Sequence, residues 1–357
     1  MKIHIKFFTI LFLKSIFYVF IVMASLAFLM NLLSELDFFR QIDVDVNFVA
    51  FLALLNSPSM IFEMFPFIFL VATQLFFIKL FEHKEIEILK YSGFKNSKII
   101  FFLLLISFIS SLIVSFGFYN ISSNLKNIYL ELKSNYTNDG KYLAVVTKNG
   151  LWIKDRVENK TLIINSKKVD QNFLIGNFIS EFDNNFNIKR NIKSKKIDIS
   201  STKWIIYDAK IYKENEYEKV PIFYLKTNFD YKRIQTLYSN LSSLDFFELY
   251  ELRENYKRLN YSITDINLQI LKLFSYPVYL VLMSIFSSLI MLNIKNINSS
   301  TFKISIGLFF SVVIYYLYNF FHVLGSTERI PLIISIAAPL LILTIINNLM
   351  LYRVNEK

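Results

Sequence analysis

The sequence contains no cysteine, and it has only seven glycines and three histidines among 357 residues. Without cysteine, neither a disulfide framework nor a thiolate metal site can form. His4, His83 and His322 lie far apart in the sequence, which argues against a histidine-rich metal cluster. None of the glycines falls in a G-x-x-x-x-G-K frame, so no phosphate-binding loop is expected.

Catalytic patterns are lacking as well. The sequence has no G-x-S-x-G turn and no H-E-x-x-H pair. No stretch brings a base, a nucleophile and an oxyanion donor together. We therefore predict no catalytic residues, no metal site and no cofactor. If the protein moves a substrate uphill, the energy is expected to come from another subunit.

Charged residues are scarce, at 19% of the chain, whereas 54% of the residues are hydrophobic and 17% are aromatic. A typical soluble domain is nearer half apolar and a quarter charged. The net charge of +11 would favour a nucleic-acid partner in a soluble protein. Here the apolar residues come in blocks, so the charge relates to membrane orientation and no nucleic-acid partner is predicted.

Six apolar blocks are each long enough to cross a bilayer core of about 30 Å. The first resembles a signal peptide because Lys2 and Lys6 precede it, but it is too long and no A-x-A-like cleavage site follows. It is expected to be a retained anchor. The blocks are 7–33, 59–80, 99–119, 268–292, 302–323 and 330–352.

The segments between the blocks indicate the topology, because Lys and Arg are enriched in cytoplasmic loops. After the first block, acidic residues outnumber the single basic residue, Arg40, so this loop is expected outside. Lysines dominate the segment after the second block. Two more lysines lie in the short segment after the fourth block, and the tail 353–357 is also basic. Both termini are therefore predicted in the cytoplasm and the long insert 121–267 outside. The lysines are Lys79, Lys84, Lys90, Lys95, Lys98, Lys295 and Lys303.

The insert 121–267 is rich in short runs of β-branched and aromatic residues separated by turn signals such as Asn149-Gly150. Such spacing is typical of a β-sandwich, jelly roll or open barrel. The expected strands are 142–147, 151–154, 161–165, 173–182, 196–200, 203–207 and 221–226.

A helix is expected at 244–260, after the strands. Ser242 is its predicted N-cap, and Leu244, Phe247 and Tyr250 would form its apolar face. The predicted fold is thus an α-helical membrane protein with six transmembrane helices and an inserted β-jellyroll-like domain. The expected parts are 1–120, 121–267 and 268–357.

The cytoplasmic segment 82–97 is predicted to form a short amphipathic helix that ends near Gly93. Two interpretations remain open: a solvated linker, or a helix that docks into a groove on a partner. Its apolar residues are Ile86, Ile88 and Leu89, and its charged residues are Lys84, Glu85, Glu87 and Lys90.

Residues 85–93 resemble the E-L-x-x-L-R-A-x-G segment of the LptF/LptG permeases, with Glu85 and Gly93 matching. Lys90 stands where the family usually has Arg, and Tyr91 is bulkier than usual. Further similar stretches extend over nearly the whole chain and favour the LptG branch. They are Phe65-Pro66, the N-G-L-W-I-K-D run 149–155, the segment 242–260 with 271–277, and Ile330-Pro331.

The resemblance implies an inner-membrane subunit of an ABC exporter that extracts lipopolysaccharide. It also implies an LptF-type permease partner, an LptB-type ATPase dimer, and LptC-type and LptA-type periplasmic jellyroll proteins. The segment 82–97 would be the coupling helix, with Glu85 as its contact to the ATPase. The coupling residues so implied are Lys84, Glu85, Ile86, Leu89, Lys90 and Gly93.

Lipopolysaccharide is expected to enter between the two permease subunits and to rise into the β domain, which would lie in the periplasm. Polar residues in membrane segments are costly and usually face a cavity or a partner, which draws attention to Glu63 and Gln74. Where LptG has basic residues near the outer end of the first helix, this sequence has only Arg40. The residues predicted along the substrate path are Arg40, Phe65, Pro66, Asn319 and His322.

Three alternatives stay open at this stage. The basic run Lys189, Arg190, Lys193, Lys195 and Lys196 either meets lipid phosphates or is a solvated strand. The protein as a whole could instead be a membrane scaffold or assembly protein, or a lipid-modifying integral-membrane enzyme. An enzyme would need clustered catalytic groups at one membrane face, and the sequence has none. A MacB-like permease would carry its external domain after one helix rather than three.

Overall fold

The computed structural model describes residues 2–82, 85–91, 95–134, 136, 151–157, 160–170, 172–183, 187–213, 216–231, 234, 240–258, 262–293 and 300–355. The chain divides into two compact units. A membrane unit comprises residues 1–126 and 267–357, and a second unit comprises residues 127–266 and contains the β-sheet.

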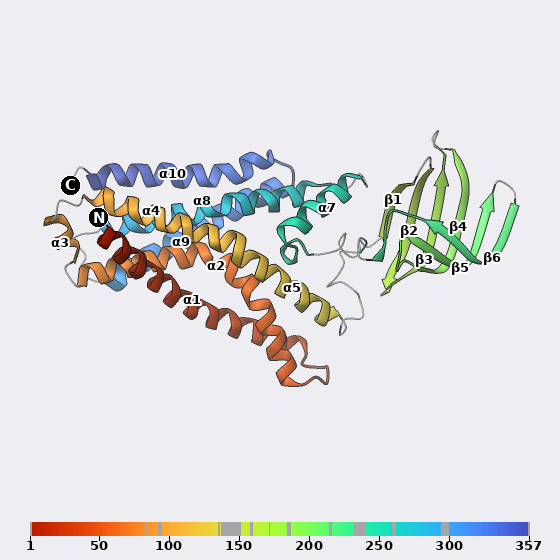
Figure 1. The fold of residues 1–357 in the computed structure, drawn as a ribbon, viewed down its shortest axis with the longest axis horizontal. Coiled ribbons are helices and arrows are strands. Elements are labelled where there is room, and N and C mark those ends of the chain that lie inside the picture. Colours follow the sequence, from red (N-terminus) through yellow and green to blue (C-terminus); the bar gives the residue numbers. More distant parts are fainter. Residues whose placement is uncertain are drawn as a thin grey trace. The chain divides into compact units, whose positions relative to one another are not determined.

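Within the described residues, six helical spans are long and apolar enough to cross a membrane, as predicted (Figure 1). Most residues in the apolar stretches of α2 and α8 are buried within the unit, whereas the buried share is 17% in α1 and 22% in α9. The spans are α1 (Lys2–Phe38), α2 (Val46–Glu82), α4 (Asn96–Leu112) continued by η1 (Ile113–Phe118) and α5 (Tyr119–Ser134), α8 (Thr264–Asn293), α9 (Ser300–Ser326) and α10 (Leu332–Asn355).

Two of these helices extend well beyond the expected blocks. α2 begins at Val46 and continues through Pro58, because a membrane helix tolerates the one backbone hydrogen bond that proline removes. The third span continues to Ser134, so the boundary expected at residue 121 lies inside a helix. This span contains a six-residue π-helix, η1, a local widening that is often found at functional positions.

The segment between α2 and α4 forms a separate short helix, α3 (Glu85–Tyr91). The helix expected at 82–97 is divided, because Glu82 belongs to α2 and Asn96 begins α4. Lys84 and Gly93 lie outside the described residues. α3 lies at the same end of the membrane unit as the start of α1 and the end of α10 (Figure 1).

The second unit contains one antiparallel sheet with the strand order β1-β2-β3-β4-β5-β6. The strand expected at 173–182 is confirmed to the residue, and the others are longer than predicted. The strand expected at 142–147 lies outside the described residues. The strands are β1 (Leu151–Val157), β2 (Lys160–Asp170), β3 (Phe173–Phe182), β4 (Ile188–Asp198), β5 (Lys203–Lys213) and β6 (Glu216–Lys226).

In two strands of the sheet the alternation of buried side chains changes phase at a residue with left-handed backbone. In β3 the alternation of buried side chains changes phase near Gly176, whose φ is 68°. In β5 it changes phase near Asp208, whose φ is 49°. Such left-handed residues locally bend and twist a strand. The fully buried side chains include Leu174, Ile179, Ile192, Ile197, Trp204, Ile206, Ala209 and Ile211.

The helix after the sheet, α7 (Phe246–Arg258), differs from the prediction at its start and in its buried face. Asp245 and Glu248 cap it reciprocally, since each side chain accepts a hydrogen bond from the other's backbone N–H (2.8 and 3.0 Å). Leu249 and Leu252 are buried, whereas Phe247 is 80% exposed. The predicted cap Ser242 and the predicted apolar face were therefore wrong.

Candidate functional site

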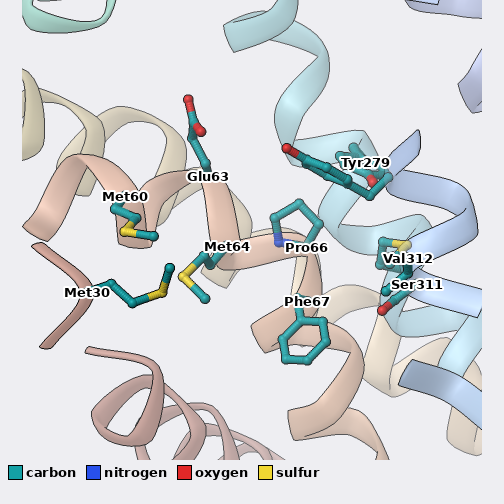
Figure 2. Close-up of a pocket in the computed structure, with 11 residues that line it drawn as sticks. Met30, Met60, Glu63, Met64, Pro66, Phe67, Tyr279, Ser311 and Val312 are labelled. Atoms are coloured by element: carbon teal, nitrogen blue, oxygen red, sulfur yellow. The ribbon is translucent and has the colours of Figure 1, made fainter. Parts of the chain in front are cut away.

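The membrane unit contains an apolar cavity of about 390 Å³ between four helices. In Figure 2, Met30, Met60 and Met64 gather on one side, and Tyr279 and Val312 lie on the other. Thioether side chains are flexible and polarisable, so they adapt to ligands of varied shape. The lining residues are Met30 from α1; Met60, Glu63, Met64, Pro66 and Phe67 from α2; Tyr279 and Met283 from α8; and Ser311, Val312 and Tyr315 from α9.

A smaller pocket of about 90 Å³ adjoins this cavity and shares four of its residues, Glu63, Pro66, Tyr279 and Tyr315. Its other lining residues are more polar: Phe62, Lys272, Tyr276, Tyr318 and Asn319. The two pockets together offer an apolar chamber joined to a chamber rich in hydroxyl groups.

The tyrosines of the small pocket are held by contacts within the bundle. The Tyr276 hydroxyl donates a hydrogen bond to the Phe62 carbonyl oxygen, which ties α8 to α2. The rings of Tyr279 and Tyr318 stack with their centroids 5.0 Å apart, which ties α8 to α9. These contacts give the pocket a preformed wall.

Three charged groups lie near one another on the side of the small pocket. Lys126 of α5 interacts electrostatically with Glu63 of α2 and with Lys272 of α8. Glu63 and Lys272 also line the pocket. One carboxylate and two ammonium groups leave a net positive charge, which favours an anionic ligand group there.

The path of α2 beside the cavity is set by Pro66 and by an aromatic cluster. Pro66 lines both pockets. Its neighbour Phe65 points away, into contacts with Phe20 of α1 (6.0 Å between centroids) and with Phe118 at the end of η1 (5.1 Å). Phe65, which precedes Pro66, thus connects this part of α2 to the π-helix through its contact with Phe118.

Comparison with protein families shows to which family this chain belongs. A family model described as "Lipopolysaccharide export system permease LptF/LptG" matches residues 6–353, nearly the whole chain. The chain belongs to the LptF/LptG family. None of the curated proteins compared with the chain matches it. The LptF/LptG chain is accordingly a multi-pass membrane protein with the role of a lipopolysaccharide export permease.

The structure of this LptF/LptG chain separates the residues predicted along the substrate path. Pro66 and Asn319 line the pockets. Phe65 is 3% exposed and packs in the aromatic cluster instead. Arg40 lies in an exposed turn after α1, and its backbone N–H bonds to the Asp37 carbonyl oxygen (3.3 Å). His322 lies one turn beyond Asn319 on α9, and the described lining of the two pockets does not include it.

Several cavity residues of the LptF/LptG chain escaped prediction, although the sequence carried a signal for some of them. Tyrosines three residues apart occur on both α8 (Tyr276, Tyr279) and α9 (Tyr315, Tyr318), which puts each pair on one helix face. The methionines had no such signal, because Met30 and Met283 come together only through the tertiary fold.

The exposed surface of α3 differs from the predicted apolar stripe. Ile86 is 6% exposed and packs in the core with Phe76, Leu80 and Ile99. Ile88 and Tyr91 are 62% and 91% exposed. For Leu89 and Lys90 the structure describes only the backbone. The surface that α3 offers is therefore formed by the exposed residues Glu87, Ile88 and Tyr91, with Glu85 partly buried beside them.

The predicted basic run of the second unit lies on β4. Lys189, Lys193, Lys195 and Lys196 are exposed. Arg190 is paired, since it donates a hydrogen bond of 2.6 Å to the carboxylate of Glu181. Among the residues that the structure describes there is no group of three His, Asp or Glu side chains that could hold a metal ion.

Proposed function

We propose that the cavity between α1, α2, α8 and α9 is where this permease receives lipopolysaccharide from the inner membrane. The observation that carries the proposal is the junction of the two chambers. A glycolipid has acyl chains joined to a polar headgroup. The methionine-lined chamber suits an acyl segment, and the chamber with Tyr276, Lys272 and Asn319 suits sugar hydroxyls.

The charges beside the small chamber support the same ligand. Lys126 and Lys272 would meet the phosphates of the lipid, and Glu63 would orient one of the two ammonium groups. In this proposal they take the part that basic residues of the first helix play in LptG. The exposed position of Arg40 in the turn after α1 favours this reassignment.

Energy for extraction is proposed to come from a separate LptB-type ATPase dimer that binds α3. α3 is anchored in the membrane unit by Ile86, and its exposed side carries Glu87, Ile88 and Tyr91. A short helix with a buried anchor and an exposed mixed surface can transmit movement of a partner into the bundle. The proposed contacts of α3 also include Glu85, Leu89 and Lys90, with Lys84 and Gly93 flanking it.

The proposed orientation puts both termini and α3 in the cytoplasm and the sheet in the periplasm. Lys79, Lys95 and Lys98 flank α3, and the start of α1 and the end of α10 lie at the same end of the unit (Figure 1). The chain, which we propose to be of the LptG type, would pair with an LptF-type permease. The sheet would pass the lipid on to LptC-type and LptA-type jellyroll proteins.

Photocrosslinking tests the proposed cavity. A photoreactive amino acid at Phe67, which lines the cavity, is expected to capture lipopolysaccharide in cells. Val312→Trp should fill the cavity and lower the yield about tenfold, the effect of about 1.4 kcal/mol in binding.

The matched control is Val313→Trp. Val313 is the next residue on α9, is 49% exposed and is outside the cavity lining, so the yield should not change. Equal yields from the two tryptophan variants would contradict this site for the substrate.

A further inference from the structure

A buried polar contact joins α2 to α9 between the cavity and the end of α2 that leads to α3. Gln74 of α2 is fully buried, and its side-chain amide donates a hydrogen bond of 3.0 Å to the Lys303 carbonyl oxygen on α9. Its Oε1 atom is also buried and has no hydrogen-bond partner among the described residues. A polar side chain with a half-satisfied amide is costly inside a membrane, so a role beyond packing is indicated.

Gly307 provides the space for this contact. A Cβ atom at Gly307 would overlap the Gln74 amide nitrogen and would lie 2.8 Å from its Cδ atom. Small residues allow membrane helices to approach closely. The Gln74 amide therefore sits in a notch on α9 that only glycine leaves open.

A second contact joins the same ends of the two helices. The Lys303 ammonium group lies 5.0 Å from the centre of the Phe81 ring, near the end of α2. α2 ends at Glu82, and α3 begins at Glu85. The first turns of α9 are therefore attached to the stretch of α2 that leads directly into α3.

Farther along α9, the same helix forms one wall of the cavity through Ser311, Val312 and Tyr315. In its most apolar stretch α9 has 22% of its residues buried within the unit, against 72% in α2. Beyond this base, α9 contacts α8 through the stack of Tyr318 on Tyr279, so a tilt of α9 about its base would change the lining of the cavity.

We infer that Gln74 and Gly307 are positioning residues that form the pivot of α9. Through this pivot, movement at α3 and at the end of α2 changes the width of the cavity. The inference rests on the cavity being the substrate site under the proposed function. The residues act through α9 and do not themselves line either pocket.

The test uses the full chain in its membrane complex, with single cysteines added to a chain that has none. Cysteine at Tyr315 reports the cavity, and cysteine at Tyr316 on the outer side of α9 is the control. Gly307→Ala should displace the Gln74 amide. Maleimide labelling at position 315 should then rise about fivefold, the population change that loss of one hydrogen bond allows. Labelling at position 316 should stay the same.

A second-site change separates the pivot from general damage. The double variant Gln74→Ala with Gly307→Ala removes the overlap and leaves only the lost hydrogen bond, so its labelling at position 315 should equal that of Gln74→Ala alone. Gly117→Ala is the matched control, because a Cβ there meets no atom within 4 Å. Gln74→Ala alone creates no overlap, so it tests the lost bond even if Gly307→Ala fails to assemble, and it too should raise labelling at position 315.

The inference is overturned if positions 315 and 316 respond alike, or if Gly307→Ala behaves as Gly117→Ala does. Photocrosslinking from Phe67 in the otherwise unchanged chain is run in parallel. If that crosslink fails while the labelling pattern holds, the pivot stands and the assignment of the substrate site falls.

Discussion

Asp155 in β1 accepts two hydrogen bonds from Asn228, one from its backbone N–H and one from its side-chain amide, each 2.8 Å long. Asp155 is 3% exposed. β1 is the first strand in the sheet order, and Asn228 follows the last strand, β6. The pair therefore joins the two outer strands of an open sheet, which no ladder of backbone hydrogen bonds connects among the described residues.

Replacing Asp155 by Ala should destabilise the sheet by about 3 kcal/mol, because two hydrogen bonds to a buried charge are lost. The emission of the buried Trp204 during urea unfolding measures this, in a Trp152→Phe background. Asp198→Ala is the control, since that carboxylate bonds only to Ser200 in an exposed turn among the contacts described. Similar losses of stability in both variants would show that the contact between Asp155 and Asn228 stabilises the sheet no more than an exposed contact does.

Stability of the sheet should also fall in acid because of Glu181. Burial by itself raises the pKa of Glu181, but hydrogen bonds from Lys160 and Arg190 outweigh it and hold the pKa below its ordinary value. The stabilisation is present above the unfolded-state pKa of about 4.3. It is lost as the pH falls through the lower folded-state pKa.

The measurement is the urea midpoint of Trp204 emission between about pH 6 and pH 3. Glu181→Gln should flatten the acid decline, and the exposed Glu218→Gln should leave it in place. A decline of unchanged steepness in Glu181→Gln would assign the acid sensitivity to other groups.

On α3, the exposed residues and the buried one should behave differently. Tyr91→Ala and Glu85→Ala are expected to lower capture of a soluble ATPase about tenfold, as for residues at the centre of an interface. Tyr352→Ala is the control, since Tyr352 is 67% exposed near the end of α10. Quantitative co-purification measures the capture.

Ile86→Ala should act instead through stability. It creates a cavity in the core beside Phe76 and Ile99, at a cost of about 2–5 kcal/mol. The thermal midpoint of the purified membrane protein should fall, whereas Tyr91→Ala should leave it unchanged. Loss of ATPase capture in Ile86→Ala without loss of stability would mean that Ile86 meets the partner directly.

At the small pocket, Lys272→Glu should lower lipopolysaccharide crosslinking from Phe67 about tenfold, because it replaces an attraction to phosphate by repulsion. Arg40→Glu carries the same change of charge into the turn after α1 and should have little effect. A larger loss from Arg40→Glu would return the phosphate contact to the first helix.

Much of the architecture was predictable because a membrane-spanning segment can be recognised from residues that are close together in the sequence. A run of about 20 apolar residues has few alternatives to a spanning helix. Strand 173–182 was also readable, since its β-branched and aromatic residues are bounded by turn signals. The start of α7 was not, because both Ser242 and Asp245 are good N-caps, and only the contact with Glu248 distinguishes them.

The sequence by itself determined the number of membrane helices and the family, because each depends on residues close together in the chain. Tertiary structure alone decided which side of α3 is exposed, which face of α7 is buried and which methionines share a cavity. It also decided that Gln74 contacts Gly307, which lies 233 residues later in the sequence. Such choices depend on which helices pack together, and a pattern of nearby residues does not encode the identity of a distant neighbour.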